Sequence, residues 1–368
     1  MNILFLGTFL PTEYEFVNKN ISAAGNQFQN NLYNTLKKNN NLIAINHISV
    51  YDTVIDEFEI EKMKKENIYT FFPRKKGFLE VLKFRQKVQE LSYWADLIIT
   101  YNVVYPWLFL RGLVKNKKCK TNLILADYTP EYESKGLKKI YAFLMRREFK
   151  YYDYAVVLSK NSKKLLGKRT LCNVVNGCIK LDMFDKINNP KINNKIVICY
   201  TGYLGIIQGV DLLLEAFNKV HNANIELWLC GQGDELKDCI DTYTKKDQRV
   251  KYKGYLKKED YIDILNQSNV LVNPRNMNYS QNEYNFPSKI LEYIASGRVV
   301  LSTKFCGYED YINNIFVCES SIESIKDELE KIIKEYSKIK DKNYKQNVEF
   351  AKNFSWDRQI NNFYKFKG

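Results

Sequence analysis

KIVICYTGYLGIIQGVDLLLEAF, residues 195–217, is the stretch that decides the fold. It joins an apolar, β-branched run to a helical pattern in which two leucines share a face with Phe217. The turn between them holds Gly202 and Gly209. A strand, a glycine turn and a helix at the first crossover of an α/β domain often bind phosphate. A tight structural turn explains the same glycines equally well, because the stretch has no G-x-G-x-x-G motif.

The same alternation of short apolar runs and longer helical patterns continues along the chain. Runs that are apolar throughout are typical of parallel sheets covered on both faces, and their alternation with helices indicates βαβ units. Between Val50 and Leu97 the pattern is unclear, and the elements there stay open. The predicted strands are 3–8, 42–50, 97–100, 121–127, 154–159, 172–177, 195–202, 225–231, 250–254, 270–274 and 299–303.

The length of 368 residues predicts two domains, because it exceeds what one hydrophobic core usually supports. The stretch 180–195 is polar, rich in asparagine and contains Pro190, which is typical of a linker. The expected parts are an N-terminal domain at 1–182, a linker at 183–194, a C-terminal domain at 195–350 and a terminal helix at 351–368.

The composition limits the partners and the compartment. A net charge of +14 favours anionic partners: phosphates, acidic lipid surfaces or nucleic acid. Cysteines such as Cys199 and Cys230 lie in apolar runs without C-x-x-C spacing, so we expect reduced thiols and a cytosolic protein. We expect no leader sequence, because the chain opens directly on an apolar run, and no run reaches about 18 apolar residues. The two histidines, His47 and His221, predict no metal site and no catalytic triad.

A second candidate for chemistry is NFPSKILEYIASGR, residues 285–298. Asn285 is the predicted N-cap of a short helix, whose first amides would face a phosphate. Glu292, one turn further, is placed to accept two hydrogen bonds from the ribose diol. The alternative is a solvated lysine–glutamate pair, although lysine before glutamate is the less favourable order. The candidate amides are those of Ser288, Lys289 and Ile290, and Lys289 adds a full positive charge.

Other candidates follow predicted strands. Gly231 and Gly233 would allow a flat base to approach the backbone, or would simply form a turn. Gly25 precedes a helical pattern within 20–36 and offers amides to an acceptor or a donor phosphate. Asp127 ends a predicted strand, where α/β sites are built, but a helix-capping role explains it at least as well.

The stretch 135–154 alternates basic and apolar residues. Most of the apolar side is expected to pack in the core, and the basic remainder resembles an interfacial helix facing anionic lipid. Its apolar residues are Leu137, Ile140, Tyr141, Phe143, Leu144 and Phe149.

These pieces, in this order, resemble the retaining glycosyltransferases of family 4 from end to end. The resemblance implies an α/β protein with the GT-B fold, two Rossmann-like doubly wound domains facing a central cleft. It is carried by ISAAGNQFQNNL, TGYLGIIQGVDLLLEAF, LWLCGQGDELKD, VLVNPR, FPSKILEYIASGRVVLSTK and the closing FSWDRQINNFY. The NPR, FPSK and EY pieces are similar to a subgroup from bacterial surface-polysaccharide clusters.

The resemblance also implies roles. Glu292 would bind the ribose, and Ser288 and Lys289 would meet the diphosphate, with Arg275 beside them. Gly231 and Gly233 would lie near the base. The family fold implies no metal and no cofactor apart from the nucleotide-sugar substrate.

The chain departs from the family pattern at three positions of the second domain, and the histidine often found after the late strand of the first domain is replaced near Asp127. The first glutamate of the paired-glutamate motif falls on Tyr284, which puts sugar recognition in doubt. The usual arginine and lysine of the glycine turn fall on Tyr203 and Gln208, so Lys289 and Arg275 would have to compensate for two phosphate charges.

The predicted function is therefore transfer of a hexose from a nucleoside-diphosphate sugar, UDP favoured over GDP, to a glycan acceptor. The acceptor expected from the resemblance is a glycan or a polyprenyl-diphosphate-linked glycan at the cytoplasmic membrane face, in the synthesis of capsule, O-antigen or exopolysaccharide. Lys289 would stabilise the leaving diphosphate, and Asp127 would lie near the acceptor. One rival is a sugar-nucleotide epimerase of the same fold. The other is a nucleic-acid-binding protein, which the dispersed lysines disfavour.

Overall fold

The computed structural model describes residues 1–11, 22–48, 55–72, 77–104, 107–114, 116, 118–133, 135–191 and 194–366. Residues 20–21, 49–50, 192–193 and 367–368, which belong to predicted segments, lie outside this part. Contacts divide the chain into two compact units. Unit 1 holds residues 1–176 with 356–368, and unit 2 holds residues 177–355.

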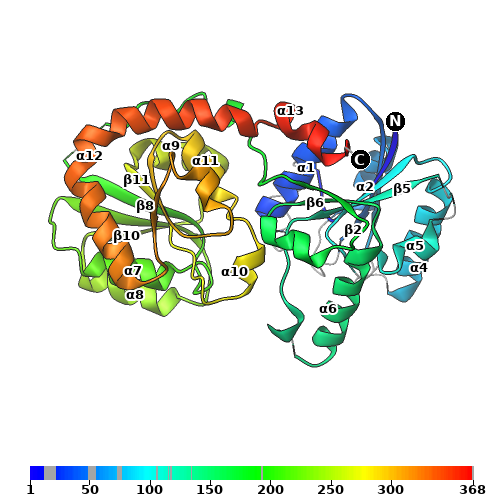
Figure 1. Cartoon of the computed structure of the whole chain (residues 1–368), viewed down its shortest axis with the longest axis horizontal. Helices are drawn as coiled ribbons and strands as arrows, with labels where there is room; N and C mark the ends of the chain where they lie inside the picture. Colours follow the sequence, from blue (N-terminus) through cyan, green and yellow to red (C-terminus); the bar gives the residue numbers. More distant parts are fainter. Residues whose placement is uncertain are drawn as a thin grey trace. The chain divides into compact units, whose positions relative to one another are not determined.

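Unit 1, drawn from blue to green in Figure 1 with α13 in red, is built on a seven-stranded parallel sheet in the order β3-β2-β1-β4-β5-β6-β7. The central strands are covered on both faces, because successive residues such as Leu4 and Phe5 are fully buried. The strands are β1 (Asn2–Gly7), β2 (Asn41–His47), β3 (Ile68–Phe71), β4 (Leu97–Tyr101), β5 (Lys120–Leu125), β6 (Tyr154–Val157) and β7 (Leu171–Val174).

In the described part of the region between Val50 and Leu97, which the sequence pattern left open, the structure has α2, β3 and α4. Helix α2 has a weak apolar pattern because Met63 is its one buried residue. Its start is instead fixed by a capping box: Asp56 accepts from the Glu59 amide at 2.8 Å, and Glu59 accepts from the Asp56 amide at 3.4 Å. The helices of unit 1 are α1 (Ala23–Lys37), α2 (Glu57–Lys65), α4 (Phe78–Leu91), α5 (Leu110–Leu113), α6 (Leu137–Glu148) and α13 (Trp356–Gln359).

Unit 2 repeats the plan with a six-stranded parallel sheet in the order β10-β9-β8-β11-β12-β13. The two parallel, Rossmann-like sheets confirm the predicted α/β class. The strands are β8 (Ile196–Tyr203), β9 (Ile225–Gln232), β10 (Val250–Gly254), β11 (Val270–Asn273), β12 (Val299–Thr303) and β13 (Phe316–Cys318). The helices are α7 (Val210–Asn218), α8 (Lys237–Lys246), α9 (Lys258–Gln267), α10 (Gln281–Tyr284), α11 (Lys289–Ala295) and α12 (Ile322–Ala351).

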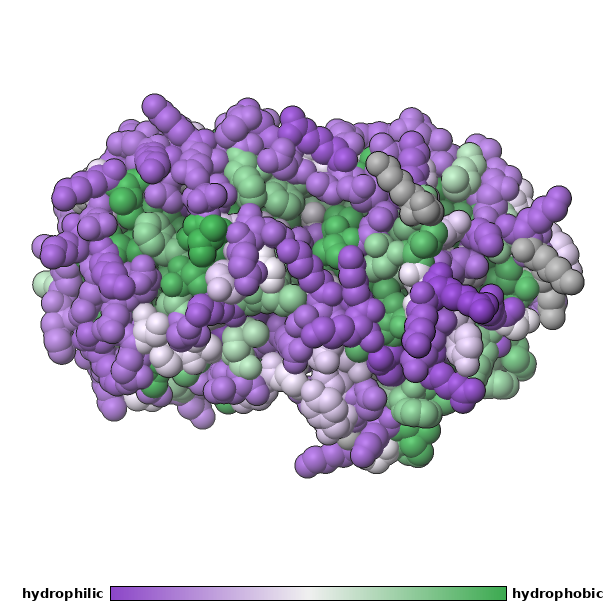
Figure 2. Space-filling model, in the orientation of Figure 1, coloured by the Kyte–Doolittle hydropathy of each residue, from purple (hydrophilic) through white to green (hydrophobic). Residues whose placement is uncertain are grey.

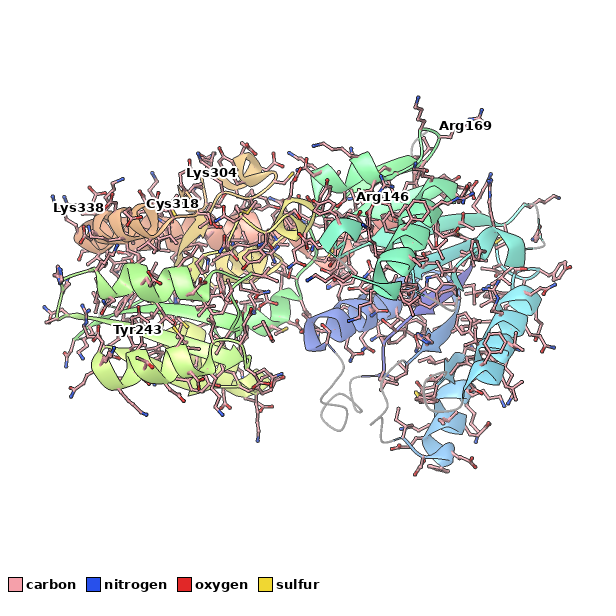
Figure 3. The ribbon with its side chains drawn as sticks, turned by 90° about the horizontal axis from the view of Figure 1, so that it is seen from below. Arg146, Arg169, Tyr243, Lys304, Cys318 and Lys338 are labelled. Atoms are coloured by element: carbon pink, nitrogen blue, oxygen red, sulfur yellow. The ribbon has the colours of Figure 1, made fainter. Side chains whose placement is uncertain are left out.

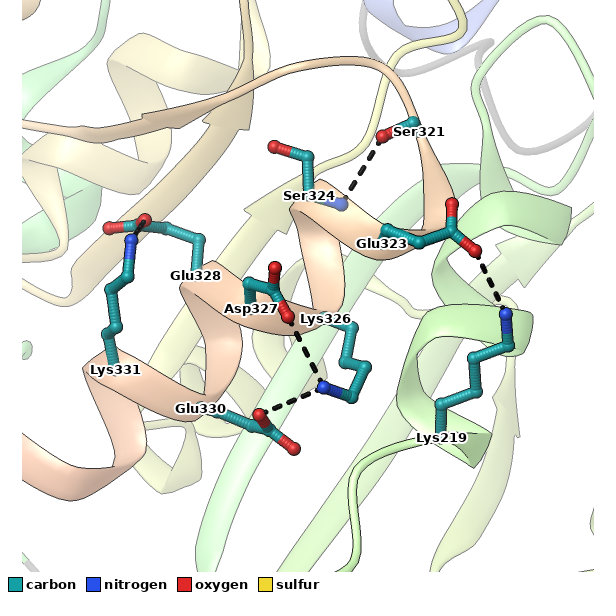
Figure 4. A network of polar contacts seen from close by, with 9 residues as sticks. All are labelled: Lys219, Ser321, Glu323, Ser324, Lys326, Asp327, Glu328, Glu330 and Lys331. Carbon is teal, nitrogen blue, oxygen red and sulfur yellow. Dashed lines mark hydrogen bonds and ion pairs between the residues drawn. The ribbon is translucent and has the colours of Figure 1, made fainter.

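Helix α12 is the longest element of unit 2 and closes its core. Leu329, Ile332 and Tyr336 are buried on its inner face. Its start is capped by Ser321, which accepts from the Ser324 amide at 3.2 Å, and Glu323 pairs with Lys219 after α7 at 3.0 Å (Figure 4). Such exposed ion pairs contribute at most about 1 kcal/mol each, so the buried face holds the helix.

The segment expected to be a linker, 183–194, packs within unit 2 as far as it is described. One residue that holds this segment is Arg298, which is fully buried. Its guanidinium donates to the carbonyl oxygens of Asn188 at 2.7 Å and Leu265 at 2.9 Å. The polar backbone of this segment therefore solvates a buried cation, a role that its composition does not distinguish from that of a linker.

The C-terminal residues from Trp356 onward belong to unit 1. Trp356 meets the ring of Phe28 edge-on at 5.2 Å, and Asn122 donates to the carbonyl oxygen of Phe363 at 2.6 Å. All eight cysteines are free thiols. Among the described helices, none combines the length and apolar character needed to cross a bilayer.

Candidate functional site

The predicted glycines of unit 2 gather at the carboxyl ends of neighbouring strands. Gly202 of β8 and Gly231 of β9 are register partners. Both have a positive φ, 145° and 141°, which side chains rarely adopt. A Cβ on Gly231 would overlap the carbonyl oxygen of Gly202, and a Cβ on Gly202 would lie 2.6 Å from Cε of Lys289. Close backbone packing therefore requires Gly231, whereas Gly202 is required by its positive φ and by the side chain of Lys289, before any ligand is considered.

Two further glycines fix the turns after these strands. Gly209 is the N-cap of α7, with φ at 73°, and a Cβ there would overlap the carbonyl oxygen of Pro274. A Cβ on Gly233 would lie 2.5 Å from the carbonyl oxygen of Leu204. The turns after β8, β9 and β11 thus touch one another and form one edge of the sheet.

The helix that carries Lys289 begins later than predicted. Asn285 is not its N-cap, because the separate helix α10 ends just before Asn285, whose amide donates to the carbonyl oxygen of Gln281 at 3.2 Å. The N-cap is Ser288. The prediction of a free Ile290 amide is also wrong, since this amide donates to the carbonyl oxygen of Pro287 at 2.9 Å. Within the described chain, the amides of Ser288 and Lys289 donate to no backbone carbonyl.

Lys289 and Glu292 do not pair with each other in the part of the chain that the structure describes. Lys289 is half-buried, with its side chain against Gly202 at the end of β8. Glu292 is half-buried too, and its Oε2 accepts a hydrogen bond from the Tyr261 hydroxyl at 2.6 Å. Burial and the charge of Glu292 raise the pKa of Tyr261 well above its ordinary value, so this hydroxyl stays protonated and donates.

Arg275 follows β11 at the same edge. Its Nη1 donates to the carbonyl oxygen of Asn285 at 2.9 Å. Its own carbonyl oxygen accepts from Thr303 Oγ1 at 2.8 Å and Ser320 Oγ at 3.2 Å. These bonds fix the backbone of Arg275 and place its guanidinium beside the stretch that leads into α11.

In unit 1 the predicted residues lie at the carboxyl edge of the sheet. Asp127 is exposed after β5, and its amide donates to Oδ1 of Asn102 at 3.3 Å. Gly25 lies in the first turn of α1, where its amide donates to Oγ of Ser22 at 3.3 Å and is therefore not open to a ligand. Burial, then the charge of Asp127, raise the pKa of Tyr101, whose hydroxyl lies beside Gly25. Gly25, Tyr101 and Asp127 therefore share one edge.

A metal site does not emerge from the described residues. No group of three or more histidine, cysteine, aspartate and glutamate side chains there is arranged to hold a metal ion.

Comparison with known proteins decides the class of enzyme. Residues 183–354, nearly all of unit 2, match the family model described as "Glycosyl transferases group 1". The protein is a GT-B glycosyltransferase. The uncharacterized glycosyltransferase MJ1069 of Methanocaldococcus jannaschii is 22% identical over 385 residues, which cover 87% of this chain and 95% of that protein.

Solved structures share the fold of this glycosyltransferase over nearly its whole length. Sucrose-phosphate synthase from Thermosynechococcus elongatus superposes with a TM-score of 0.71 at 14% identity, covering 98% of this chain and 96% of the other. HepE from Anabaena, solved in complex with UDP, gives a TM-score of 0.70 at 14% identity, covering 98% and 97%.

The three departures from the family pattern lie close to the glycosyltransferase's glycine turn or to α11. Tyr203 is about half exposed, and its carbonyl oxygen accepts from the Tyr200 hydroxyl at 2.8 Å. Oε1 of Gln208 lies 2.8 Å from where a Cβ on Gly205 would be. Tyr284 is the last residue of α10. No cation replaces the missing arginine and lysine at these positions.

Three site residues were missed by reasoning from the sequence. Tyr261 orients Glu292, and Tyr293 ties α11 to β8 by accepting from the Thr201 amide at 3.0 Å. Glu235 accepts from the Ile206 amide at 3.1 Å, inside the glycine turn. Tyrosines in helical patterns are usually core residues, so neither tyrosine gave a signal. Glu235 was detectable, because it follows the glycines of LCGQGDEL.

Proposed function

We propose that this glycosyltransferase is a family 4 enzyme that transfers a hexose, with retention of configuration, from a UDP-sugar or, less favoured, a GDP-sugar. The acceptor is a glycan or a polyprenyl-diphosphate-linked glycan in surface-polysaccharide synthesis, at the cytoplasmic face of the membrane. One observation carries the proposal: Lys289 lies against the end of β8, while the carboxylate of Glu292 accepts a hydrogen bond from Tyr261. A cation and an oriented carboxylate one helical turn apart suit a diphosphate and a ribose.

The chemistry of the donor follows from these positions. Lys289, with the amides of Ser288 and Lys289, stabilises the diphosphate as it leaves with the electron pair of the bond to C1 of the sugar. Arg275, at the same edge, adds a second positive charge. The hydroxyl of Tyr261 binds Oε2 of Glu292 and so directs Oε1 towards the ribose diol. Because Tyr203 and Gln208 are neutral, these two cations carry the electrostatic part of catalysis.

The acceptor supplies the attacking hydroxyl group. The acceptor hydroxyl attacks C1 from the face that the diphosphate leaves, which is how retaining enzymes of this family generally act. Asp127 is the polar group proposed to lie near the acceptor. HepE, which shares the fold, has been solved with UDP-glucose, and this supports a UDP-sugar as the donor.

Thermal-shift measurements with UDP, GDP and their common sugars test the donor. Bound ligand raises the melting temperature by mass action, by an amount equivalent to about 2.7 kcal/mol at a concentration of roughly 100 Kd. We expect UDP to raise it most. No rise with either diphosphate would contradict the proposal. Conversion of a UDP-sugar to an isomer without any acceptor would point to an epimerase instead.

A further inference from the structure

Helix α6 exposes the apolar residues that the sequence pattern assigned mainly to the core. Leu137, Ile140 and Phe143 are 84%, 59% and 55% exposed. Their spacing of three residues places them on one face of the helix. Tyr132, in the turn that precedes α6, is 66% exposed. Large apolar side chains gathered on one exposed face form a candidate interaction surface, and the charges around that face indicate which partner it suits.

The C-terminal end of α6 is anchored to the rest of unit 1, and the exposed N-terminal half extends from this anchored end. Arg146 donates to the carbonyl oxygen of Leu165 in the neighbouring 3₁₀ turn (Figure 3). Glu148 is buried and accepts from the Phe109 amide at 3.0 Å. All residues from Leu137 to Ile140 are exposed, in contrast. Figure 2 shows hydrophobic side chains gathered over this part of unit 1.

The charges around the apolar face are almost all positive. Among the described residues of 132–150, the exposed ionic side chains are five cations and the single acid Glu133. None of the five forms an ion pair with a carboxylate in the described chain. The cations are Lys135, Lys138, Lys139, Arg147 and Lys150.

We propose that α6 docks onto the surface of an anionic phospholipid bilayer. Leu137, Ile140 and Phe143 enter the boundary between headgroups and acyl chains, and the surrounding lysines contact the phosphates. A second copy of the chain fits this surface poorly, because both copies would bring the same cations together and each carries a net charge of +14. The docking would serve a lipid-linked acceptor, but it depends on no nucleotide or sugar.

Co-sedimentation of the full chain with vesicles tests the docking separately from the transferase reaction. One set of vesicles is equimolar phosphatidylglycerol and phosphatidylcholine, and the other is phosphatidylcholine alone. The first triple variant is Leu137→Ser, Ile140→Ser, Phe143→Ser, and the second is Lys135→Glu, Lys138→Glu, Lys139→Glu. We expect each to lower the partition coefficient on the anionic vesicles by roughly 100-fold or more.

The chain offers a matched control for each variant. Phe78, Leu79 and Leu82 are exposed apolar residues of α4, and Lys237, Lys245 and Lys246 are exposed lysines of α8. Changing the first three to serine or the second three to glutamate should alter binding less than about threefold. All four variants change exposed residues, so their melting temperatures should match that of the wild type.

Several outcomes would overturn the proposal. These are a wild type that stays with the supernatant, α6 variants that bind as well as their controls, and an equal loss of binding in the α4 variant. A dimer in solution would also overturn the proposal if the Leu137→Ser, Ile140→Ser, Phe143→Ser variant were monomeric, because a second copy of the chain would then cover α6.

Discussion

The two units share a strand order but differ at the carboxyl edge of their sheets. In both, the first strand is central, the next two lie on one side and the rest on the other. In unit 2 the edge is made of backbone against backbone, as where Gly231 meets Gly202. In unit 1 the corresponding edge is made by side chains that bond loops, such as Asn102 to the amides of Ala126 and Asp127.

This difference indicates how each unit is suited to its ligand. Backbone packed against backbone leaves little freedom, so the edge of unit 2 would be set before the proposed donor arrives, which favours binding of a common nucleotide diphosphate. Side chains that hold loops are replaced more easily, so the edge of unit 1 would suit the proposed acceptor, which can differ from one enzyme to another.

The largest expected effect tests this contrast with one glycine from each edge. Gly231→Ala should lower the free energy of unfolding by about 3–5 kcal/mol, because a Cβ overlaps the Gly202 carbonyl oxygen and φ is positive. Gly25→Ala should change it by no more than about 1 kcal/mol, because its Cβ would lie 3.4 Å from Ser22 Oγ, an ordinary contact. Urea unfolding measures both. Equal losses of unfolding free energy in the two variants would contradict the difference between the backbone-packed edge of unit 2 and the edge of unit 1.

The second effect concerns charge at the edge of unit 2. Lys289→Ala should weaken nucleoside-diphosphate binding by about 10- to 150-fold, because a charge-assisted contact worth about 1.5–3 kcal/mol is lost. Calorimetric titration with UDP measures it. Lys237→Ala on α8 is the matched control, since this lysine is exposed in the same unit. Unchanged affinity in Lys289→Ala would remove the cation from the proposed site.

The sequence predicted the sheets of both units far better than the details of the site. The apolar run 299–303 coincides with β12, because a strand that is buried on both faces has an unmistakable composition. The run 250–254 coincides with the edge strand β10, although only Val250 is buried there. The late start of α11 was not predictable, because α10 and the bond from Arg275 to Asn285 are tertiary consequences. The exposure of α6 was missed for a similar reason. An apolar helical face has the same pattern whether protein or lipid covers it.

The third effect concerns the hydrogen bond that orients Glu292. Tyr261→Phe removes the hydroxyl that holds Oε2, and little else of the ring. We expect UDP affinity to fall about 5- to 10-fold, which corresponds to the loss of about 1 kcal/mol of ordering. The affinity for inorganic diphosphate, which has no ribose, should stay the same. If both ligands lost affinity equally, Tyr261 would support the fold of α9 and α11 rather than the orientation of Glu292.

The smallest effect is a pH dependence of opposite sign in the two units. In unit 1, burial raises the pKa of Glu148, so the stability linked to this group is full at low pH and is lost as pH rises through the folded pKa. In unit 2, the guanidinium of Arg249, bound to Asp247 at 2.7 Å, lowers the pKa of that carboxyl. Its stability is present at neutral pH and is lost as pH falls through the folded pKa.

Substitution should therefore give opposite slopes. Relative to the wild type, Glu148→Gln should gain stability as pH rises from about 4 to 7, and Asp247→Asn should lose it as pH rises from about 2 to 5, each by about 1 kcal/mol. Urea unfolding at several pH values measures both. Slopes of the same sign would mean that burial does not dominate at Glu148. The hydrogen bond from the Phe109 amide, which favours the charged carboxylate of Glu148, would then outweigh burial. The side chains of unit 1 would in that case hold their loops as rigidly as the backbone contacts hold the turns of unit 2.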